Sequence, residues 1–420
     1  MPHNPAGNAR SGWILEGAPD TQAIRIWSLG AAERQRRLLA RSGCDPIASV
    51  AEGEEPPEPR TPSVMIARAD AILDERLVQG LAAAKNTLLV ADRRRNGGWG
   101  GPVAAHVDAK RAADALEALR GAMRLDAHEA SAAEERALAS GLRLAAPTEL
   151  AGSYSAALRK LDPPFVYPLR AERVREIEDR IFHSSYKGVT DLITKWIWPR
   201  PAAAAVRVLA RARVQPNAVT ALSWLLALAC GALFWSGEFG WGLAVGWLMT
   251  FLDTVDGKLA RVTLTSSRFG HVFDHALDLI HPPFWYLAWG VGVSGGIDGA
   301  AIAVIAGYLL GRALEGIFIA AFGIETHCWR PIDSLFRTVT ARRNPNLLLL
   351  SVAALGGRPD LGLVMVAIWT FASAAFHVER IAQALYERSR GVRIECWDAA
   401  SESGAPGAQR EAQPGQEGAA

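Results

Sequence analysis

Two kinds of hydrophobic pattern divide this chain. Up to about residue 165, short apolar runs alternate with amphipathic segments. The runs Ser63–Ala67 and Asn86–Val90 have the length and composition of buried strands, whereas Asp74–Ala84 and Asp108–Gly121 show helical periodicity. Alternating strands and helices predict a layered α/β domain over residues 1–165.

From about residue 217 onward, the apolar runs become long enough to cross a bilayer, which takes about 20 residues of helix. A shorter run, 347–355, is interpreted as the core of one further span. The fold class is therefore predicted to be mixed, with an N-terminal α/β domain followed by an all-α membrane domain of six transmembrane helices. The five long runs lie at 218–237, 239–260, 270–293, 297–323 and 360–381.

Three further segments complete the predicted organisation. Residues 166–213 mix Arg, Glu and Lys with large apolar side chains, which predicts an amphipathic helix on the membrane surface. A linker helix packed on the α/β domain is the alternative. The membrane domain is placed at 214–393. Residues 394–420 are rich in Gly, Ala, Gln and Glu and are expected to be disordered.

Composition and charge agree with this division. The 420 residues are 50% hydrophobic, and the net charge of +2 does not favour nucleic acid as a partner. The four cysteines are far apart and suggest neither a disulfide framework nor a cysteine zinc site. Lys and Arg flank one side of the predicted spans, and the opposite turns hold a single basic residue, Arg358. The positive-inside rule then places both termini and the α/β domain in the cytosol, with the spans in the cell (inner) membrane.

Charged residues gather inside the predicted membrane domain. Eleven lie between positions 218 and 323, and seven of these fall between 253 and 278. A charge at the centre of a span costs roughly 2.5–3.5 kcal/mol, so such residues suggest a functional site. Asp253 and Asp256 are three residues apart, and Asp274 and Asp278 are four apart, so each pair shares a helical face. We expect the four carboxylates to converge where the two helix ends meet.

The residues around these acids suggest what they bind. Converging carboxylates repel one another unless cations neutralise them, and oxygen ligands suit Mg²⁺ or Mn²⁺ bound together with phosphates. Gly257 and Gly270 leave room for a ligand, and Arg261 offers a planar pair of donors to a phosphate. The residues alone therefore predict a metal-bound diphosphate at the cytosolic membrane face.

The segment from Asp253 to Asp278 follows the pattern D-x2-D-G-x2-A-R-x8-G-x3-D-x3-D without a departure. This pattern resembles the signature of the CDP-alcohol phosphotransferase family, as does the sequence from Pro216 to Thr220 before the first span. The resemblance covers about residues 170–390. It implies an integral membrane enzyme that transfers a substituted phosphate from a CDP-alcohol, often CDP-diacylglycerol, to the hydroxyl of a polar acceptor and releases CMP.

The resemblance also implies roles for individual residues. Two Mg²⁺ or Mn²⁺ ions would be held by Asp253, Asp256, Asp274 and Asp278, and Asp278 would be the catalytic base on the acceptor hydroxyl. A homodimer is expected from the resemblance as well. The acceptor stays open, with glycerol phosphate, inositol phosphate and serine among the candidates. The CDP pocket would be lined by Asn217, Thr220, Asp256, Gly257, Ala260, Arg261 and Gly270.

The N-terminal domain resembles sugar-nucleotidyltransferase domains in its strand–helix alternation and in Arg68-Ala69-Asp70 at the end of a predicted strand. Such domains open with a glycine-rich loop that cradles a triphosphate, whereas the stretch from Ser28 to Arg34 contains one glycine. The glycine-rich stretch from Asn96 to Gly101 is interpreted as a flexible loop. We therefore predict a degenerate domain. The alternative is a bifunctional enzyme whose N-terminal domain makes a CDP-alcohol such as CDP-inositol.

Several weaker signals admit two interpretations. Arg312 either pairs with Glu315 along one helix or holds a phosphate. The pair Arg342-Arg343 is predicted to be a positive-inside anchor, with phosphate binding as the alternative. Three histidines beside the acidic motif are expected to be packing or hydrogen-bonded residues: His271, His275 and His281. For the whole chain, an ion-coupled transporter, a structural ion-pair network and an inactive scaffold are the competing hypotheses.

Overall fold

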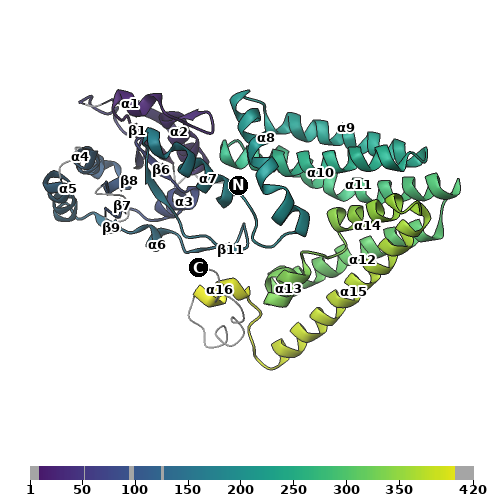
Figure 1. Ribbon diagram of the computed structural model, residues 1–420. Helices are drawn as coiled ribbons and strands as arrows, with labels where there is room; N and C mark the ends of the chain where they lie inside the picture. The colour runs from purple at the N-terminus through teal and green to yellow at the C-terminus, as the bar shows by residue number, and fades with distance from the viewer. Residues whose placement is uncertain (1–8, 52, 94–98, 124–126, 403–420) are drawn as a thin grey trace, which may run out of the picture. The chain divides into compact units, whose positions relative to one another are not determined.

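The computed structural model describes residues 9–51, 53–93, 99–123 and 127–402 (Figure 1). The chain forms two compact units. The first contains the chain up to Ser153, together with 162–184 and 262–264. The second contains Tyr154–Leu161, Ser185–Arg261 and the chain from Thr265 onward. The first unit thus extends past the boundary predicted at residue 165.

A mixed six-stranded sheet organises the first unit, in the order β4-β1-β5-β8-β7-β9. Strand β1 is parallel to both β4 and β5, β8 is antiparallel to β5 and β7, and β9 is parallel to β7. Every residue of β5 is buried, in keeping with the apolar run from Val64 to Ala67 at its centre. The strands are β1 (Arg10–Leu15), β4 (Cys44–Val50), β5 (Ser63–Arg68), β7 (Thr87–Ala91), β8 (Gly101–Asp108) and β9 (Arg143–Ala145).

Helices pack on this sheet and confirm the predicted α/β class. Helix α4 contributes Ala115, Leu116 and Leu119 to the core that contains Ile66 of β5. Helix α3 starts where Asp74 accepts a hydrogen bond from the Arg76 backbone N–H. The helices are α1 (Pro19–Ala23), α2 (Ala31–Arg41), α3 (Glu75–Ala83), α4 (Ala112–Met123), α5 (Ala127–Ala139), α6 (Pro147–Leu150) and α7 (Val174–Ser184). Four short strands complete the unit: β2 (Arg25–Ile26), β3 (Leu29–Gly30), β6 (Ala71–Leu73) and β12 (Val166–Pro168).

The single amphipathic helix predicted within 166–213 is wrong, because this segment is divided among several elements. Helix α7 belongs to the first unit, whereas a π-helical turn (Ile193–Ile197) and α8 (Pro199–Arg211) belong to the second. Pro199 begins α8, as expected of a residue that is well suited to the first turn of a helix but cannot continue one. Helix α8 by itself is amphipathic, and its buried residues recur every four positions, at Ala202, Val206 and Ala210.

Helices make up most of the second unit. Figure 1 shows long helices from α9 to α12 and α15. They are α9 (Pro216–Trp235), α10 (Phe239–Val262), α11 (Arg268–Ser294), α12 (Gly299–Phe322) and α15 (Pro359–Ser389). Shorter elements are the hairpin of β10 (Tyr154–Ser155) and β11 (Lys160–Leu161), the 3-10 turn η4 (Thr326–Cys328), α13 (Pro331–Phe336), α14 (Arg343–Leu355) and α16 (Trp397–Glu402).

Three of these helices, α9, α12 and α15, are long and apolar enough to cross a membrane. Helices α10 and α11 are long enough but less apolar, because glycine, tryptophan and the acidic motif lower their mean hydropathy. Helix α14 has 13 residues, or about 20 Å of helix, which is less than the hydrocarbon thickness. The structure therefore supports a membrane domain with three candidate spans among the described residues.

Close packing of α9 on α11 aligns the ends that carry the predicted site. A Cβ atom added at Gly231 of α9 would lie 2.0 Å from the Phe284 ring, and one added at Gly292 of α11 would lie 2.0 Å from the Phe234 carbonyl oxygen. Small residues let helix backbones approach closely in membranes. The two helices run parallel, so Asn217 at the start of α9 lies beside Gly270 at the start of α11.

Part of the predicted disordered tail, 394–420, is ordered. Helix α16 lies within it, and the Trp397 indole donates a hydrogen bond of 3.0 Å to Ser334 Oγ. An aromatic anchor of this kind can hold a polar segment on the fold. Residues 403–420 lie outside the described part of the chain, as do residues 96–98 of the predicted glycine-rich loop.

Candidate functional site

Two of the four predicted metal ligands lie on α10. Asp256 is buried, with 3% of its surface exposed, and its Oδ2 accepts a hydrogen bond of 2.5 Å from Thr220 Oγ1 of α9. The Oδ1 atoms of Asp256 and Asp253 are buried and have no hydrogen-bond partner within the described residues. A buried carboxylate oxygen without a partner is costly, and a divalent cation would satisfy it. The donor set therefore fits Mg²⁺ or Mn²⁺.

The other two ligands lie on α11. Ser267 caps this helix by accepting a hydrogen bond of 3.0 Å from the Gly270 N–H. The cap fixes where the helix starts, so that Gly270, Asp274 and Asp278 follow one another along one face. Asp274 is half-buried, whereas the Asp278 side chain is 51% exposed. Asp274 therefore lies in a more buried environment than Asp278.

Arg343, the first residue of α14, joins the two helices of the motif. Its Nη1 donates a hydrogen bond of 2.9 Å to Asp278 Oδ1, and its Nη2 pairs with Asp253 Oδ2. Across the described chain, the four carboxylates do not form a group whose ligand atoms all lie within 4.8 Å of one another. Mutual repulsion accounts for this spacing, and the guanidinium supplies a positive charge between two of the acids.

A cavity of about 110 Å³ brings together all seven residues predicted to bind the cytidine nucleotide. Its shape depends on two glycines. A Cβ at Gly270 would lie 2.8 Å from Asn217 Oδ1, whereas one at Gly257 would enter open space 3.9 Å from Arg261 Nη1. Arg261 also donates a hydrogen bond of 2.9 Å to the Ser185 carbonyl oxygen. The residues lining this smaller cavity include Asn217, Thr220, Asp256, Gly257, Ala260, Arg261, Gly270 and Asp274.

A larger cavity of about 420 Å³ has Asp278 on its wall. Four of its cations pair with acids: Arg159 with Glu325, Arg312 and Arg342 with Glu315, and Arg343 with Asp278. The cluster of basic side chains predicts affinity for an anionic ligand. The basic residues that line it are Arg159, Lys187, Arg312, Arg337, Arg342 and Arg343.

Arg337 is the clearest sign of an anion site in the larger cavity. Its Nη1 atom is buried and has no hydrogen-bond partner among the residues that the structure describes. Burial, together with the nearby Arg342, lowers the pKa of this guanidinium to about 9. The side chain is still charged at neutral pH. A buried cation with an unused donor is energetically costly unless a ligand provides the acceptor.

Several of the weaker predictions are now resolved. Arg312 pairs with Glu315 at 3.1 Å, which confirms the contact along one helix, and it also lines the larger cavity, where phosphate binding stays a prediction. Arg342 contacts Glu315 and Arg343 contacts Asp278, so both side chains lie at the site, and their role as a positive-inside anchor stays a prediction. The sequence contains one indication that these arginines have a role at the site. Cations at a helix N-terminus oppose the helix dipole, so two arginines before α14 suggest a role beyond the helix itself.

The histidines beside the motif behave as expected. The His281 ring is buried, and its Nδ1 lies 2.6 Å from the Leu277 carbonyl oxygen one turn earlier. The rings of His271 and His275 are in contact, with centroids 4.1 Å apart. Ring packing therefore accounts for His271 and His275, whereas the buried His281 Nε2 has no hydrogen-bond partner among the described residues.

Comparisons with known proteins find matches to part of this chain. The chain is 32% identical over 103 residues to a phosphatidylinositol phosphate synthase of Streptomyces avermitilis, which covers 24% of this chain and 42% of that protein. It is 30% identical over 155 residues to a bifunctional IPC transferase and DIPP synthase of Rubrobacter xylanophilus, covering 36% of this chain and 33% of the relative. The chain thus spans less than half the length of either relative.

The crystal structure of Mycobacterium tuberculosis phosphatidylinositol phosphate synthase with CDP-DAG bound aligns with 43% of this chain and 94% of that one, at 18% identity and a TM-score of 0.35. The model of the CDP-alcohol phosphatidyltransferase family matches residues 213–371. This range contains α9 to α12, α14 and the whole acidic motif. Residues 213–371 therefore form a CDP-alcohol phosphatidyltransferase domain.

Proposed function

We propose that this chain is a membrane enzyme that moves a substituted phosphate from a CDP-alcohol, most simply CDP-diacylglycerol, to the hydroxyl of a polar acceptor, releasing CMP. One observation carries the proposal. The acids of the motif are shared between two cavities, with Asp256 and Asp274 on the smaller one and Asp278 on the larger one. A donor and an acceptor can therefore each reach the same acidic cluster from a separate cavity.

The smaller cavity suits the donor. Arg261 presents its guanidinium beside the open space at Gly257, which a diphosphate can occupy. Asn217 and Thr220 provide polar groups close by. Asp253, Asp256, Asp274 and Asp278 would hold two Mg²⁺ or Mn²⁺ ions, which neutralise charge on a diphosphate when bound. The motif residues thus position the donor and stabilise the CMP that leaves.

Asp278 suits the role of catalytic base. Its carboxylate is half exposed and lies on the wall of the larger cavity, where an acceptor hydroxyl can approach. As Asp278 takes the hydroxyl proton, the acceptor oxygen bonds to the phosphorus that carries the donor alcohol. The bond from this phosphorus to the bridging oxygen breaks, and CMP leaves with the electron pair. Arg343 orients the base through its hydrogen bond.

The larger cavity favours a phosphorylated polyol as acceptor. Arg337 has a buried donor without a partner, and a phosphate oxygen would satisfy it. Polar groups elsewhere on the wall, including Thr340, Asn344 and Ser373, can bind hydroxyls. A relative of this chain is named a phosphatidylinositol phosphate synthase. We therefore place inositol phosphate first among the acceptors.

Product analysis tests this assignment. Purified protein is given CDP-diacylglycerol, Mg²⁺ or Mn²⁺, and one acceptor at a time, and the lipids formed are identified by mass spectrometry. We expect inositol phosphate and glycerol phosphate to be used, and inositol and serine to be used at least about tenfold less well, because they lack the phosphate that Arg337 binds. Faster transfer to an unphosphorylated acceptor would contradict the assignment.

The membrane arrangement is part of the proposal. Leu222, Leu225 and Leu228 of α9 are exposed on the protein surface, as expected of a lipid-facing stripe. We propose that α10, α11 and α14 complete a six-helix membrane domain in the cell membrane, with the acidic cluster at its cytosolic face. All four motif carboxylates lie in the second half of α10 or the first half of α11, so they share one side of the helix midpoints, which favours an enzyme over an ion-coupled transporter. A homodimer stays a prediction.

A second candidate function is suggested by the bifunctional relative. In that case the N-terminal unit would make the CDP-alcohol. However, Asp70 at the end of β5 is already bound through both oxygens by the buried Arg68, at 2.9 and 2.6 Å. Residues 28–34 form the end of a β2–β3 hairpin and the first turn of α2, in place of a glycine-rich loop. These contacts support a degenerate domain.

A nucleotide assay tests the degenerate domain. Full-length D278N is given CTP and inositol phosphate, so that any CDP-inositol formed is not consumed by the membrane domain. We expect none above a protein-free blank, because the Asp70 carboxylate is already bound by Arg68. CDP-inositol that accumulates with time and with protein concentration would establish the bifunctional alternative.

A further inference from the structure

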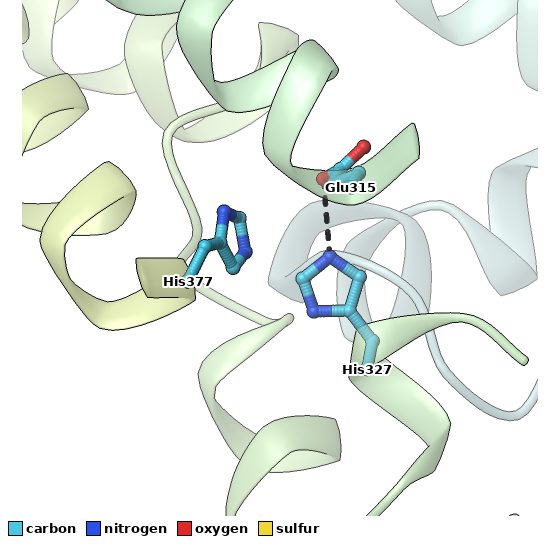
Figure 2. Close-up of side chains that lie close together, drawn as sticks. All are labelled: Glu315, His327 and His377. Atoms are coloured by element: carbon cyan, nitrogen blue, oxygen red, sulfur yellow. Dashed lines mark hydrogen bonds and ion pairs between the residues drawn. The ribbon is translucent and has the colours of Figure 1, made fainter. Parts of the chain in front are cut away.

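A second group of candidate ligands lies apart from the aspartates. It consists of Glu315 on α12, His327 on η4 and His377 on α15, whose potential ligand atoms all lie within 4.8 Å of one another. Figure 2 shows the carboxylate and the two imidazole rings close together, from three separate segments of the chain. We propose that these three residues bind a divalent transition metal of the Zn²⁺ type.

The two histidines have buried ring nitrogens without hydrogen-bond partners, as expected of side chains that bind a ligand. His377 is 2% exposed, and neither of its ring nitrogens has a hydrogen-bond partner among the described residues. His327 is also 2% exposed, and within the same part of the chain its Nδ1 is unpartnered. Buried polar atoms are almost always paired, because leaving them unpaired is costly. A metal would satisfy one nitrogen of His377, and His327 would contribute its Nε2, which already lies beside Glu315 Oε1.

The geometry matches a small metal ion. Glu315 Oε1 and His327 Nε2 are 3.2 Å apart. Two ligands at about 2.1 Å from a tetrahedral zinc ion are separated by about 3.4 Å, so this pair needs almost no movement.

The arginines around Glu315 orient its carboxylate, and their positive charge affects how a metal can bind. Arg312 and Arg342 hold Glu315 Oε2, which leaves Oε1 for the metal, as outer partners of metal ligands commonly do. These arginines and Arg337 also repel a cation. The metal is therefore expected to bind with an anion beside it. All three ligands line the larger cavity, so a fourth coordination position can face that space, an arrangement typical of catalytic rather than structural zinc sites.

Cobalt spectroscopy tests the proposal. Full-length D253N, in which the aspartate site is weakened, is titrated with Co²⁺ in sulfate buffer. Sulfate replaces phosphate because it keeps Co²⁺ in solution. Four-coordinate Co²⁺ with nitrogen ligands absorbs visible light far more strongly than the six-coordinate ion at an oxygen site. We expect a single equivalent of strongly absorbing Co²⁺, displaced by Zn²⁺, and at least about tenfold weaker binding without sulfate because of the arginines.

Matched variants locate the metal. In the D253N background, H377Q and H327N should each remove the strong absorption, and H377C should restore it with an added sulfur-to-metal band. H275A removes a histidine from the wall of the same cavity and should leave the spectrum unchanged. Absence of the strong bands, or their persistence in H377Q, would overturn the proposal. The readout is independent of catalysis, so a failed transferase assay would leave this result standing.

Discussion

Replacing Asp278 with asparagine should lower the rate of CMP release by about 10²- to 10⁴-fold, the usual contribution of a positioned base. The amide keeps the shape of the side chain but takes up no proton. Folding and membrane insertion should persist, because the side chain is 51% exposed and its ion pair is with Arg343, which also has Asp253 as a partner. The measurement is acceptor-dependent CMP release by protein that elutes as wild type in size-exclusion chromatography.

Asp298 provides the matched control. It caps α12 by accepting a hydrogen bond from the Ala300 N–H, and asparagine caps helices equally well. D298N should therefore turn over at close to the wild-type rate. If D278N also kept near-normal turnover, Asp278 would not be the base.

Replacing Arg337 with glutamine should raise the KM for inositol phosphate by about 30-fold or more. Truncating a buried charge contact costs about 2 kcal/mol or more, and each 1.4 kcal/mol is tenfold in affinity. The KM for CDP-diacylglycerol should change little, because Arg337 lines the larger cavity and the donor is assigned to the smaller one. Steady-state kinetics with each substrate varied in turn separates the two effects.

Arg312 is the control within the same cavity. Its side chain is 45% exposed and already paired with Glu315. Solvent therefore screens its charge, and Glu315 neutralises part of it. R312Q should raise the acceptor KM by less than about threefold. Equal effects of R312Q and R337Q, or a raised donor KM in R337Q, would contradict the assignment of Arg337 to the acceptor phosphate.

The local part of the site could be predicted from sequence because helical spacing is fixed. Asp253 and Asp256, like Asp274 and Asp278, are close enough along one helix that their shared face follows from the 3.6-residue repeat. The seven residues expected around the nucleotide do line one cavity, since they lie within the first turns of α9 and the facing ends of α10 and α11. What they bind is still a prediction.

The contacts between distant segments could not be predicted from the sequence pattern. Arg343 pairs with Asp253 across 90 positions, and nothing in either local sequence specifies that register. Glu315, His327 and His377 come from three elements and have no motif spacing. The interfacial helix was mispredicted because Pro199 was not treated as the start of a new helix. Among the described residues, three helices are long and apolar enough to cross a membrane, and α14 with 13 residues is shorter than the bilayer, so the six-helix domain stays a proposal.

The central claim concerns two substrates that reach one acidic cluster from separate cavities. The most direct measurement is a crystal structure with CDP-diacylglycerol and Mn²⁺, whose anomalous scattering locates the metal. We expect Mn²⁺ among Asp253, Asp256 and Asp274, and the diphosphate beside Arg261, with the larger cavity left to the acceptor. A diphosphate in the larger cavity against Arg337, or Mn²⁺ away from the aspartates, would contradict the account.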